Sequence, residues 1–178
     1  MLKYLSILII GSLFIACEND IAEVQKYISK DLTAVETAKE IEMLYSDSAM
    51  VKVRVTSPTL IRHLDNSNPR QEFPDGISME FLNASHRTTS RMTAKYALRF
   101  EKEGKVVMRD SVVWLSEKNE QLETEELIWE ETKDKVYTKK FVVIRKAEEI
   151  IYGHGFESNK DFTEWRINAI QGRKKINN

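Results

Sequence analysis

The sequence predicts an all-β fold with antiparallel strands, and three observations lead to this prediction. After Tyr45, apolar and polar residues alternate with a period of two, which is typical of strands with one buried face. Clusters of turn-forming residues separate these runs at intervals of roughly 8–12 residues. No helical pattern interrupts them, which excludes a parallel sheet built from β-α-β units. The spacing is compatible with a sandwich, a barrel or a jelly roll.

The composition excludes several classes of function. The 178 residues make about one domain, and 42% hydrophobic with 31% charged residues is ordinary for a globular protein. The 27 basic residues balance the 28 acidic ones, so we expect no nucleic-acid partner. One cysteine and three scattered histidines are too few for a disulfide or a zinc site. We therefore expect no metal and no cofactor.

The N-terminus resembles a bacterial lipoprotein signal. Lys3 precedes an apolar run over residues 5–16, which is shorter than the ~20 residues of a membrane-spanning helix. We predict a signal peptide over residues 1–16. Cys17 follows Phe14-Ile15-Ala16, a pattern similar to a lipobox, so we expect it to be acylated and to begin the mature chain. The alternative is an uncleaved anchor in which Cys17 is incidental.

The segment between this cysteine and the first strand is predicted to be a tether. Residues 21–45 contain no glycine or proline, and their apolar residues recur at steps of three and four. We expect a lipid anchor and a helical or partly ordered tether over residues 17–44, a β-domain over residues 45–172 and a basic tail over residues 173–178. The apolar positions with the helical spacing are Ile21, Val24, Ile28, Leu32, Val35 and Ala38.

The predicted strands follow one another along the rest of the chain. Turns are expected at residues 74–76, 103–104, 117–119 and 133–134. In the longest alternating run, residues 92–100, Leu98 and Phe100 are expected to point inward, with Arg99 and Glu101 outward. We assign Gly76, Gly153 and Gly155 to backbone positions that need positive φ or a bulge. The expected strands span residues 51–56, 77–81, 92–100, 106–115, 122–129, 135–137, 141–145, 150–153 and 164–170.

Several short phrases of the sequence occur in a characteristic order. The phrase LETEELIW at residues 122–129 is followed by VYT, FVVI and then IYGHGFESN at residues 151–159. Together with YSDS at residues 45–48 and FPDGI at residues 73–77, this order resembles the LptC family, the periplasmic component of the lipopolysaccharide export transporter. The sequence departs from the family in Asn159, where aspartate is usual, and in the lipobox, which replaces a transmembrane helix.

The resemblance implies a β-jelly roll, open along one side and similar to OstA and LptA, that holds the acyl chains of lipid A. The domain would accept lipopolysaccharide from the inner-membrane ABC transporter and pass it to a periplasmic bridge protein. It would be periplasmic and lipid-anchored, with the inner membrane favoured by the family's role. The candidate lipid contacts, which are equally compatible with an ordinary core, are Phe81, Met92, Tyr96, Leu98, Phe100, Trp114, Trp129 and Phe141.

By the same resemblance, two sheet edges would bind partner chains by strand addition. LptF- and LptG-like membrane subunits would pair with an N-terminal edge at Val51, Val53 and Val55. An LptA-like bridge protein would pair with a C-terminal edge at Trp165, Ile167 and Ala169.

The sequence does not predict an enzyme, because its serine, histidine and acidic residues do not form a recognisable catalytic set. Paired acids such as Glu125-Glu126 lie on adjacent strand positions and point to opposite faces. The alternative to lipid transport is a lipoprotein β-sandwich that serves adhesion or assembly and carries no lipid.

Overall fold

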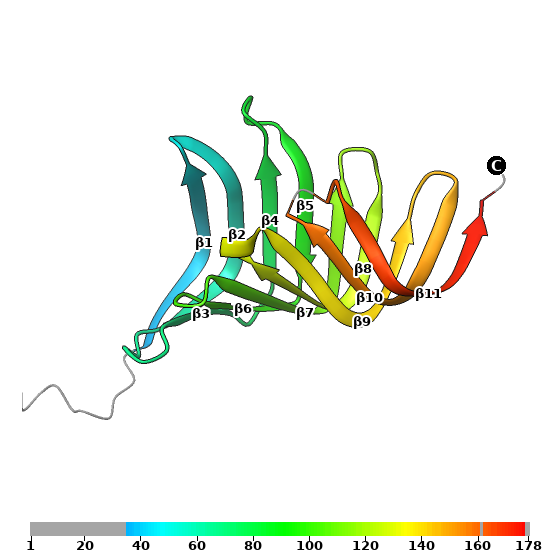
Figure 1. The fold of residues 1–178 in the computed structure, drawn as a ribbon. Helices are drawn as coiled ribbons and strands as arrows, with labels where there is room; N and C mark the ends of the chain where they lie inside the picture. Colours follow the sequence, from blue (N-terminus) through cyan, green and yellow to red (C-terminus); the bar gives the residue numbers. More distant parts are fainter. Residues whose placement is uncertain (1–34, 161, 177–178) are drawn as a thin grey trace, which may run out of the picture. The chain divides into compact units, whose positions relative to one another are not determined.

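The structure, a computed structural model, describes residues 35–160 and 162–176, and it is built from antiparallel β-strands (Figure 1). Eleven strands pair into one continuous sheet. A short 3-10 turn, η2 (Glu131–Lys133), precedes the ninth strand. The all-β antiparallel prediction is confirmed. The strands are β1 (Val35–Asp47), β2 (Met50–His63), β3 (Arg70–Phe73), β4 (Ile77–Leu82), β5 (Thr88–Ala94), β6 (Tyr96–Phe100), β7 (Lys105–Ser116), β8 (Gln121–Glu130), β9 (Lys135–Arg145), β10 (Glu149–Asn159) and β11 (Trp165–Lys175).

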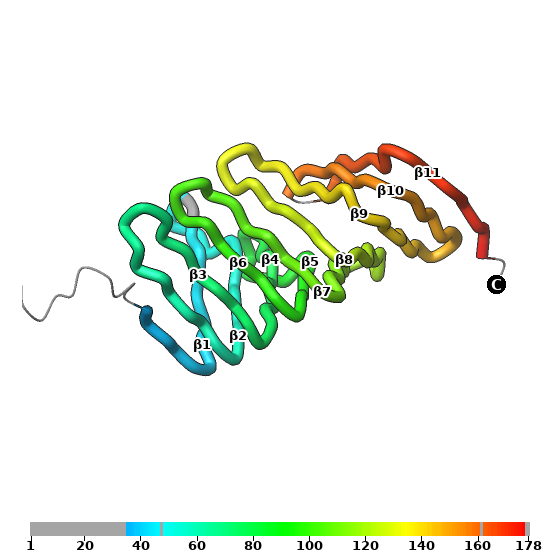
Figure 2. Tube along the Cα trace, turned by 90° about the horizontal axis from the view of Figure 1, so that it is seen from below, coloured from blue at the N-terminus to red at the C-terminus, as the bar shows by residue number. Residues whose placement is uncertain are grey.

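The sheet folds over itself into two layers, because its long strands pass from one layer to the other. The first half of β2 pairs with β4, and its second half pairs with β3. In the same way, β7 pairs with β6 through its first half and with β5 through its second half. We call the two layers the β4–β5 layer and the β3–β6 layer, after the short strands that each contains. Figure 2 shows the strands following one another from β1 at one end of the sheet to β11 at the other.

Bulges near the middle of the long strands allow them to bend between the layers. The ladder of β7 with β8 shifts between Arg109 and Val112, and the two intervening residues have φ values of 62° and 56°. The ladder of β10 with β9 shifts between His154 and Phe156, around Gly155 with a φ of 74°. Extra residues in a bulge bend a strand, and glycine accepts positive φ because it has no Cβ.

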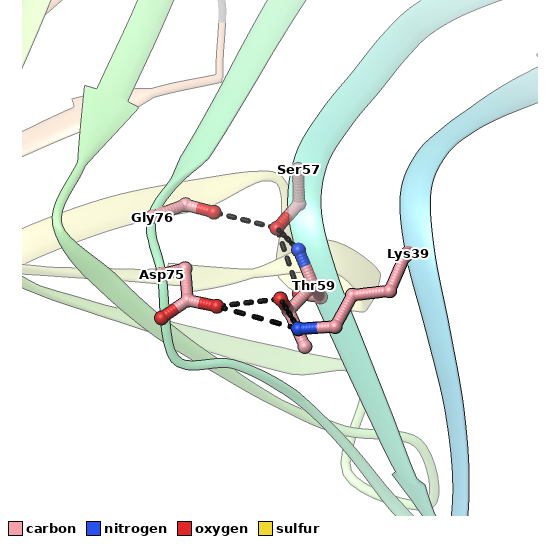
Figure 3. Close-up of polar contacts among 5 residues, drawn as sticks. All are labelled: Lys39, Ser57, Thr59, Asp75 and Gly76. Atoms are coloured by element: carbon pink, nitrogen blue, oxygen red, sulfur yellow. Dashed lines mark hydrogen bonds and ion pairs between the residues drawn. The ribbon is translucent and has the colours of Figure 1, made fainter.

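Buried hydroxyl groups bind backbone carbonyls at these bends. The Ser57 hydroxyl lies 2.6 Å from the carbonyl oxygen of Gly76 (Figure 3). On β8, Thr124 donates to the carbonyl oxygen of Phe141 at 2.8 Å. A buried carbonyl that lacks a donor costs about 1–3 kcal/mol. Serine and threonine at the bends therefore stabilise the places where the regular ladder is interrupted.

A polar cluster connects β1 to its neighbours (Figure 3). Lys39 donates to the Thr59 hydroxyl at 2.7 Å, and Thr59 donates to the Asp75 carboxylate. The Lys39 ammonium lies 4.0 Å from the same carboxylate. Strand β1 is thereby attached to β2 and to the β3–β4 turn by side chains as well as by its backbone ladder.

Aromatic side chains fill the space between the layers toward the β11 end of the sheet. Trp114 of β7 stacks on Phe162, with ring centroids 4.3 Å apart. Phe156 of β10 lies 5.9 Å from Phe162 and 6.3 Å from Trp165. Between these rings and their neighbours, a cavity of only ≈ 10 Å³ remains.

The prediction of one continuous strand over residues 92–100 is wrong. The chain bends at Lys95, and strands β5 and β6 on either side lie in different layers. Ala94 is buried before the bend and Ala97 after it, so the inward positions change from even to odd numbers. A bend of one residue inverts the side-chain parity, because the period of a strand is two. The turns predicted at residues 74–76, 103–104, 117–119 and 133–134 are confirmed.

The predicted tether is wrong over its last ten residues, because strand β1 begins at Val35. Ile41, Met43 and Tyr45 alternate with exposed residues and pack against the core, which is a strand period. Pairing with β2 along its whole length stabilises this segment as a strand. The predicted signal peptide, Cys17 and the remainder of the tether lie outside the described residues.

Candidate functional site

A largely apolar cavity of ≈ 640 Å³ lies between the two layers, toward the β1 end of the sheet. We call it the interlayer pocket. Inward-facing positions of β2 and β4 form one wall, and Phe73, Val106 and Trp129 of the β3–β6 layer form the other. The strand period of two explains why these side chains share one wall, since every second residue of a strand points to the same side. The apolar residues that the β4–β5 layer contributes to the pocket are Val53, Val55, Ile77, Met79, Phe81 and Leu82.

Charged and polar side chains also line the interlayer pocket. The Arg99 guanidinium of β6 donates twice to Glu131 of η2, from Nε to Oε1 at 2.8 Å and from Nη2 to Oε2 at 3.0 Å. The Arg99 side chain is 21% exposed and that of Glu131 25%. The Arg99 Cζ atom also lies 5.5 Å from the centre of the Tyr45 ring, a cation–π contact with strand β1.

Two groups of this cluster have a raised pKa, each for a different reason. Burial raises the pKa of Tyr45, although Arg99 partly opposes the effect. Hydrogen bonds to Glu131 raise the pKa of Arg99. At neutral pH, Tyr45 is therefore neutral and Arg99 is charged, and Arg99 donates to Glu131 beside the Tyr45 ring.

One donor in the interlayer pocket has no acceptor among the described residues. The indole nitrogen of Trp129 is buried and makes no hydrogen bond there, while its ring contacts Phe81 edge to face at 6.2 Å. An apolar cavity with a few polar groups at defined positions is typical of small-molecule sites. The arrangement suits an amphiphilic ligand with a hydrocarbon part and a polar end.

The predicted lipid contacts separate into three groups in the structure. Phe81 and Trp129 line the interlayer pocket. Met92 and Trp114 are buried in the core and do not line the pocket. The inward placement of the remaining four, Tyr96, Leu98, Phe100 and Phe141, is wrong.

The placement of these four residues failed for two different reasons. The bend at Lys95 places Arg99 on the inward side of β6, and Tyr96, Leu98 and Phe100 therefore lie on the opposite face. Phe141 lies at the bulge of β9, is 39% exposed and contacts His154 on the surface. Because of the bend at Lys95, the outward placement of Arg99 predicted from strand parity is also wrong.

The structure also reassigns the N-terminal edge. Val51, Val53 and Val55 belong to β2, which pairs with β1 on one side and with β3 and β4 on the other. Strand β1 is the edge of the described sheet instead, because among residues 35–160 and 162–176 it pairs only with β2. Trp165, Ile167 and Ala169 lie in β11, which pairs only with β10 in the part of the chain that the structure describes and is the opposite edge there.

The predicted structural glycines occupy restrictive positions. Gly76 has a φ of 101°, and a Cβ at Gly153 would lie 2.2 Å from the carbonyl oxygen of Ala169 in the neighbouring strand. Sequence reasoning missed the polar residues of the interlayer pocket, among them Tyr45, Arg99 and Glu131. The alternation of Ile41, Met43 and Tyr45 was the available signal for the first of them.

Comparisons with known proteins do not assign the chain to a family. No model of a protein family matches the sequence, and no curated protein matches it. In the described part of the chain, no helix is long and apolar enough to cross a membrane. No group of three or more possible metal ligands occurs among the same residues. The fold and the interlayer pocket define the class, a two-layered antiparallel β-protein with a largely apolar pocket between its layers.

Proposed function

We propose that this protein is a lipid-carrying component of lipopolysaccharide export, similar to the LptC family. The single observation that carries the proposal is the interlayer pocket, an apolar space of ≈ 640 Å³ between two layers of an antiparallel sheet. In this proposal the two layers are those of a jelly roll open along one side. The protein binds its cargo and performs no chemistry on it.

The physical reason is the cost of exposing acyl chains to water. Each methylene group left in water costs about 0.8 kcal/mol, so a chain in transit needs a continuous apolar surface. Alternate residues of β2 and β4 provide that surface without interruption over Val53, Val55, Met79 and Phe81. Binding distributed over many weak contacts allows the cargo to leave again.

The proposed assembly uses both edges of the sheet. Strand β1 would add to LptF- and LptG-like membrane subunits, and β11 would add to an LptA-like bridge protein. An acylated Cys17 would hold the protein at the periplasmic face of the inner membrane. Two acyl chains provide stable anchoring, whereas a single chain binds marginally.

Photocrosslinking in cells tests the proposal. A photoreactive residue at Phe81, in the interlayer pocket, is expected to crosslink lipopolysaccharide while the transporter is running, and less without ATP. The matched control is Leu98, an apolar residue on the opposite face of its strand, where no crosslink is expected. Equal crosslinking at both positions would contradict binding between the layers.

The alternative is an adhesion or assembly module without lipid cargo. It is favoured by the aromatic filling of the β11 half of the interlayer space, since a domain that only binds proteins needs a closed core. If neither position crosslinks lipid in a folded protein with an active transporter, this alternative replaces lipid transport.

A further inference from the structure

We infer that Arg99 is the receptor for an anionic headgroup of the amphiphile bound in the interlayer pocket, and that the ligand's anion replaces Glu131 on the guanidinium. The inference rests on the proposed function, because it assumes that an acyl chain occupies this pocket. It adds the class of ligand, an acyl chain that ends in a phosphate or a carboxylate, and the residue that selects it.

The location of Arg99 sets it apart from other ion-paired arginines. Arg109 pairs with Glu126 at 2.9 Å on the outer surface, and its side chain is 54% exposed. The Arg99 side chain is 21% exposed and lines a cavity. Partial removal from water makes a charge-assisted hydrogen bond stronger than the same bond on the surface. Arg99 therefore lies where a hydrogen bond to the anionic group of a ligand would increase the affinity for that ligand.

The charges that line the interlayer pocket favour an anion. Its charged residues are Lys52, Arg99, Lys160 and Glu131, three cations and one anion. Lys160 lies 3.8 Å from Asp134, and Lys52 has no ion pair among the described residues. An anionic ligand that displaced Glu131 from Arg99 would thus meet an excess of positive charge.

The carboxylate of Glu131 and the anionic group that would replace it bind a guanidinium in the same way. Glu131 presents two oxygens to the planar guanidinium, and a phosphate or carboxylate presents oxygens with the same fork geometry. Glu131 belongs to the single turn η2, and its side chain can rotate away from Arg99 about its own χ angles without a change in the backbone. The exchange conserves the hydrogen bonds of Arg99.

A matched pair of probes tests the inference. The probes are 1-palmitoylglycerol and 1-palmitoylglycerol-3-phosphate, which share an acyl chain and differ by the phosphate. Calorimetry on the full-length protein is expected to show about tenfold or greater preference for the phosphate-bearing probe, as expected for hydrogen bonds to a charged group. Inorganic phosphate alone is expected to displace neither probe, because it brings no hydrocarbon to bury.

Substitutions of the two partners of the ion pair are expected to change the affinity for the phosphate-bearing probe in opposite directions. Arg99→Gln is expected to reduce the ratio of the affinities for the charged and the neutral probe to about one, while the affinity for the neutral probe stays the same. Glu131→Gln is expected to tighten binding of the phosphate-bearing probe, since it removes the competing carboxylate, and misfolding cannot produce this gain. Arg109→Gln, the surface control, should leave both affinities unchanged.

The outcomes separate the inference from the proposed function. If both probes bind the wild-type protein equally, or if Arg99→Gln keeps the preference, the headgroup assignment is overturned while lipid binding stands. Displacement by inorganic phosphate would identify a free-anion site and would also overturn it. If neither probe binds, the proposed function fails and the inference fails with it.

Discussion

Three side chains on the outer face of the β3–β6 layer form a cluster that connects three strands. His63 of β2 lies 2.9 Å from Glu72 of β3 through Nε2, and Tyr96 of β6 donates to the other oxygen of Glu72 at 3.0 Å. The hydrogen bond from His63 is the main cause that lowers the pKa of Glu72, and Tyr96 contributes in the same direction. The ionised carboxylate is thus the form that the folded protein stabilises.

This cluster predicts a loss of stability in acid. Because the pKa of Glu72 is lower in the folded protein than in the unfolded chain, its contribution to stability is fully present above the pKa that it has in the unfolded chain. The contribution disappears as the pH falls through the folded pKa. Glu72→Gln should lower the free energy of unfolding at neutral pH by roughly 1–3 kcal/mol and should flatten the decrease in acid.

Urea denaturation across a pH series measures both effects. Glu126→Gln is the control, since this carboxylate pairs with the exposed Arg109 and should contribute less than about 1 kcal/mol. Parallel pH profiles for wild type and Glu72→Gln would contradict the assignment to this residue.

At the scale of elements, the attachment of β11 to the sheet depends on the close approach of two backbones. A Cβ at Gly153 would lie 2.2 Å from the carbonyl oxygen of Ala169 and 2.9 Å from the Cα of Ile170. Both atoms belong to the backbone of β11 and cannot move without shifting the strand. Only glycine at this position allows the β10–β11 ladder to form across its register shift.

Gly153→Ala is therefore expected to detach β11 and to cost about 3 kcal/mol or more, as severe overpacking does. Hydrogen exchange should show faster exchange of the β11 amides than in the wild-type protein. The matched control is Gly172→Ala in the same ladder, because its new Cβ would meet the side chain of Tyr152, which is exposed and can rotate. Similar protection of β11 in both variants would contradict this explanation.

At the scale of the whole molecule, the space between the layers differs between the two ends of the sheet. Toward β1 it contains the interlayer pocket of ≈ 640 Å³, and toward β11 aromatic rings fill it. Phe162, in the turn between β10 and β11, is the residue that contacts both Trp114 and Phe156. A cargo that passed along the whole sheet would have to displace this ring.

Phe162→Ala is expected to lower the free energy of unfolding by about 3–5 kcal/mol, because a buried aromatic leaves a cavity. In the proposed function, the same variant should also bind longer acyl chains than the wild-type protein. Thermal unfolding and mass spectrometry of bound lipids measure the two effects. Phe141→Ala, on the surface, should change stability by about 0.5 kcal/mol and leave the chain length unchanged. Equal stability losses would contradict the role of Phe162.

The sequence by itself determined the fold class and the places of most strands and turns. These features depend on local signals, namely the alternation of apolar residues and the turn residues between the runs. Phe81 and Trp129, which lie on well-alternating strands, could therefore be located on the inward side of the sheet.

The tertiary structure alone decided which strands are edges and which face of β6 is inward. Residues 35–39 carry no strand period of their own, and pairing with β2 is what makes them part of β1. Lys95 is an ordinary strand residue by sequence, yet the bend there moves Arg99 to the pocket and Leu98 away from it. Both outcomes depend on contacts between residues far apart in the chain, and a parity that one bend inverts cannot be read from local alternation.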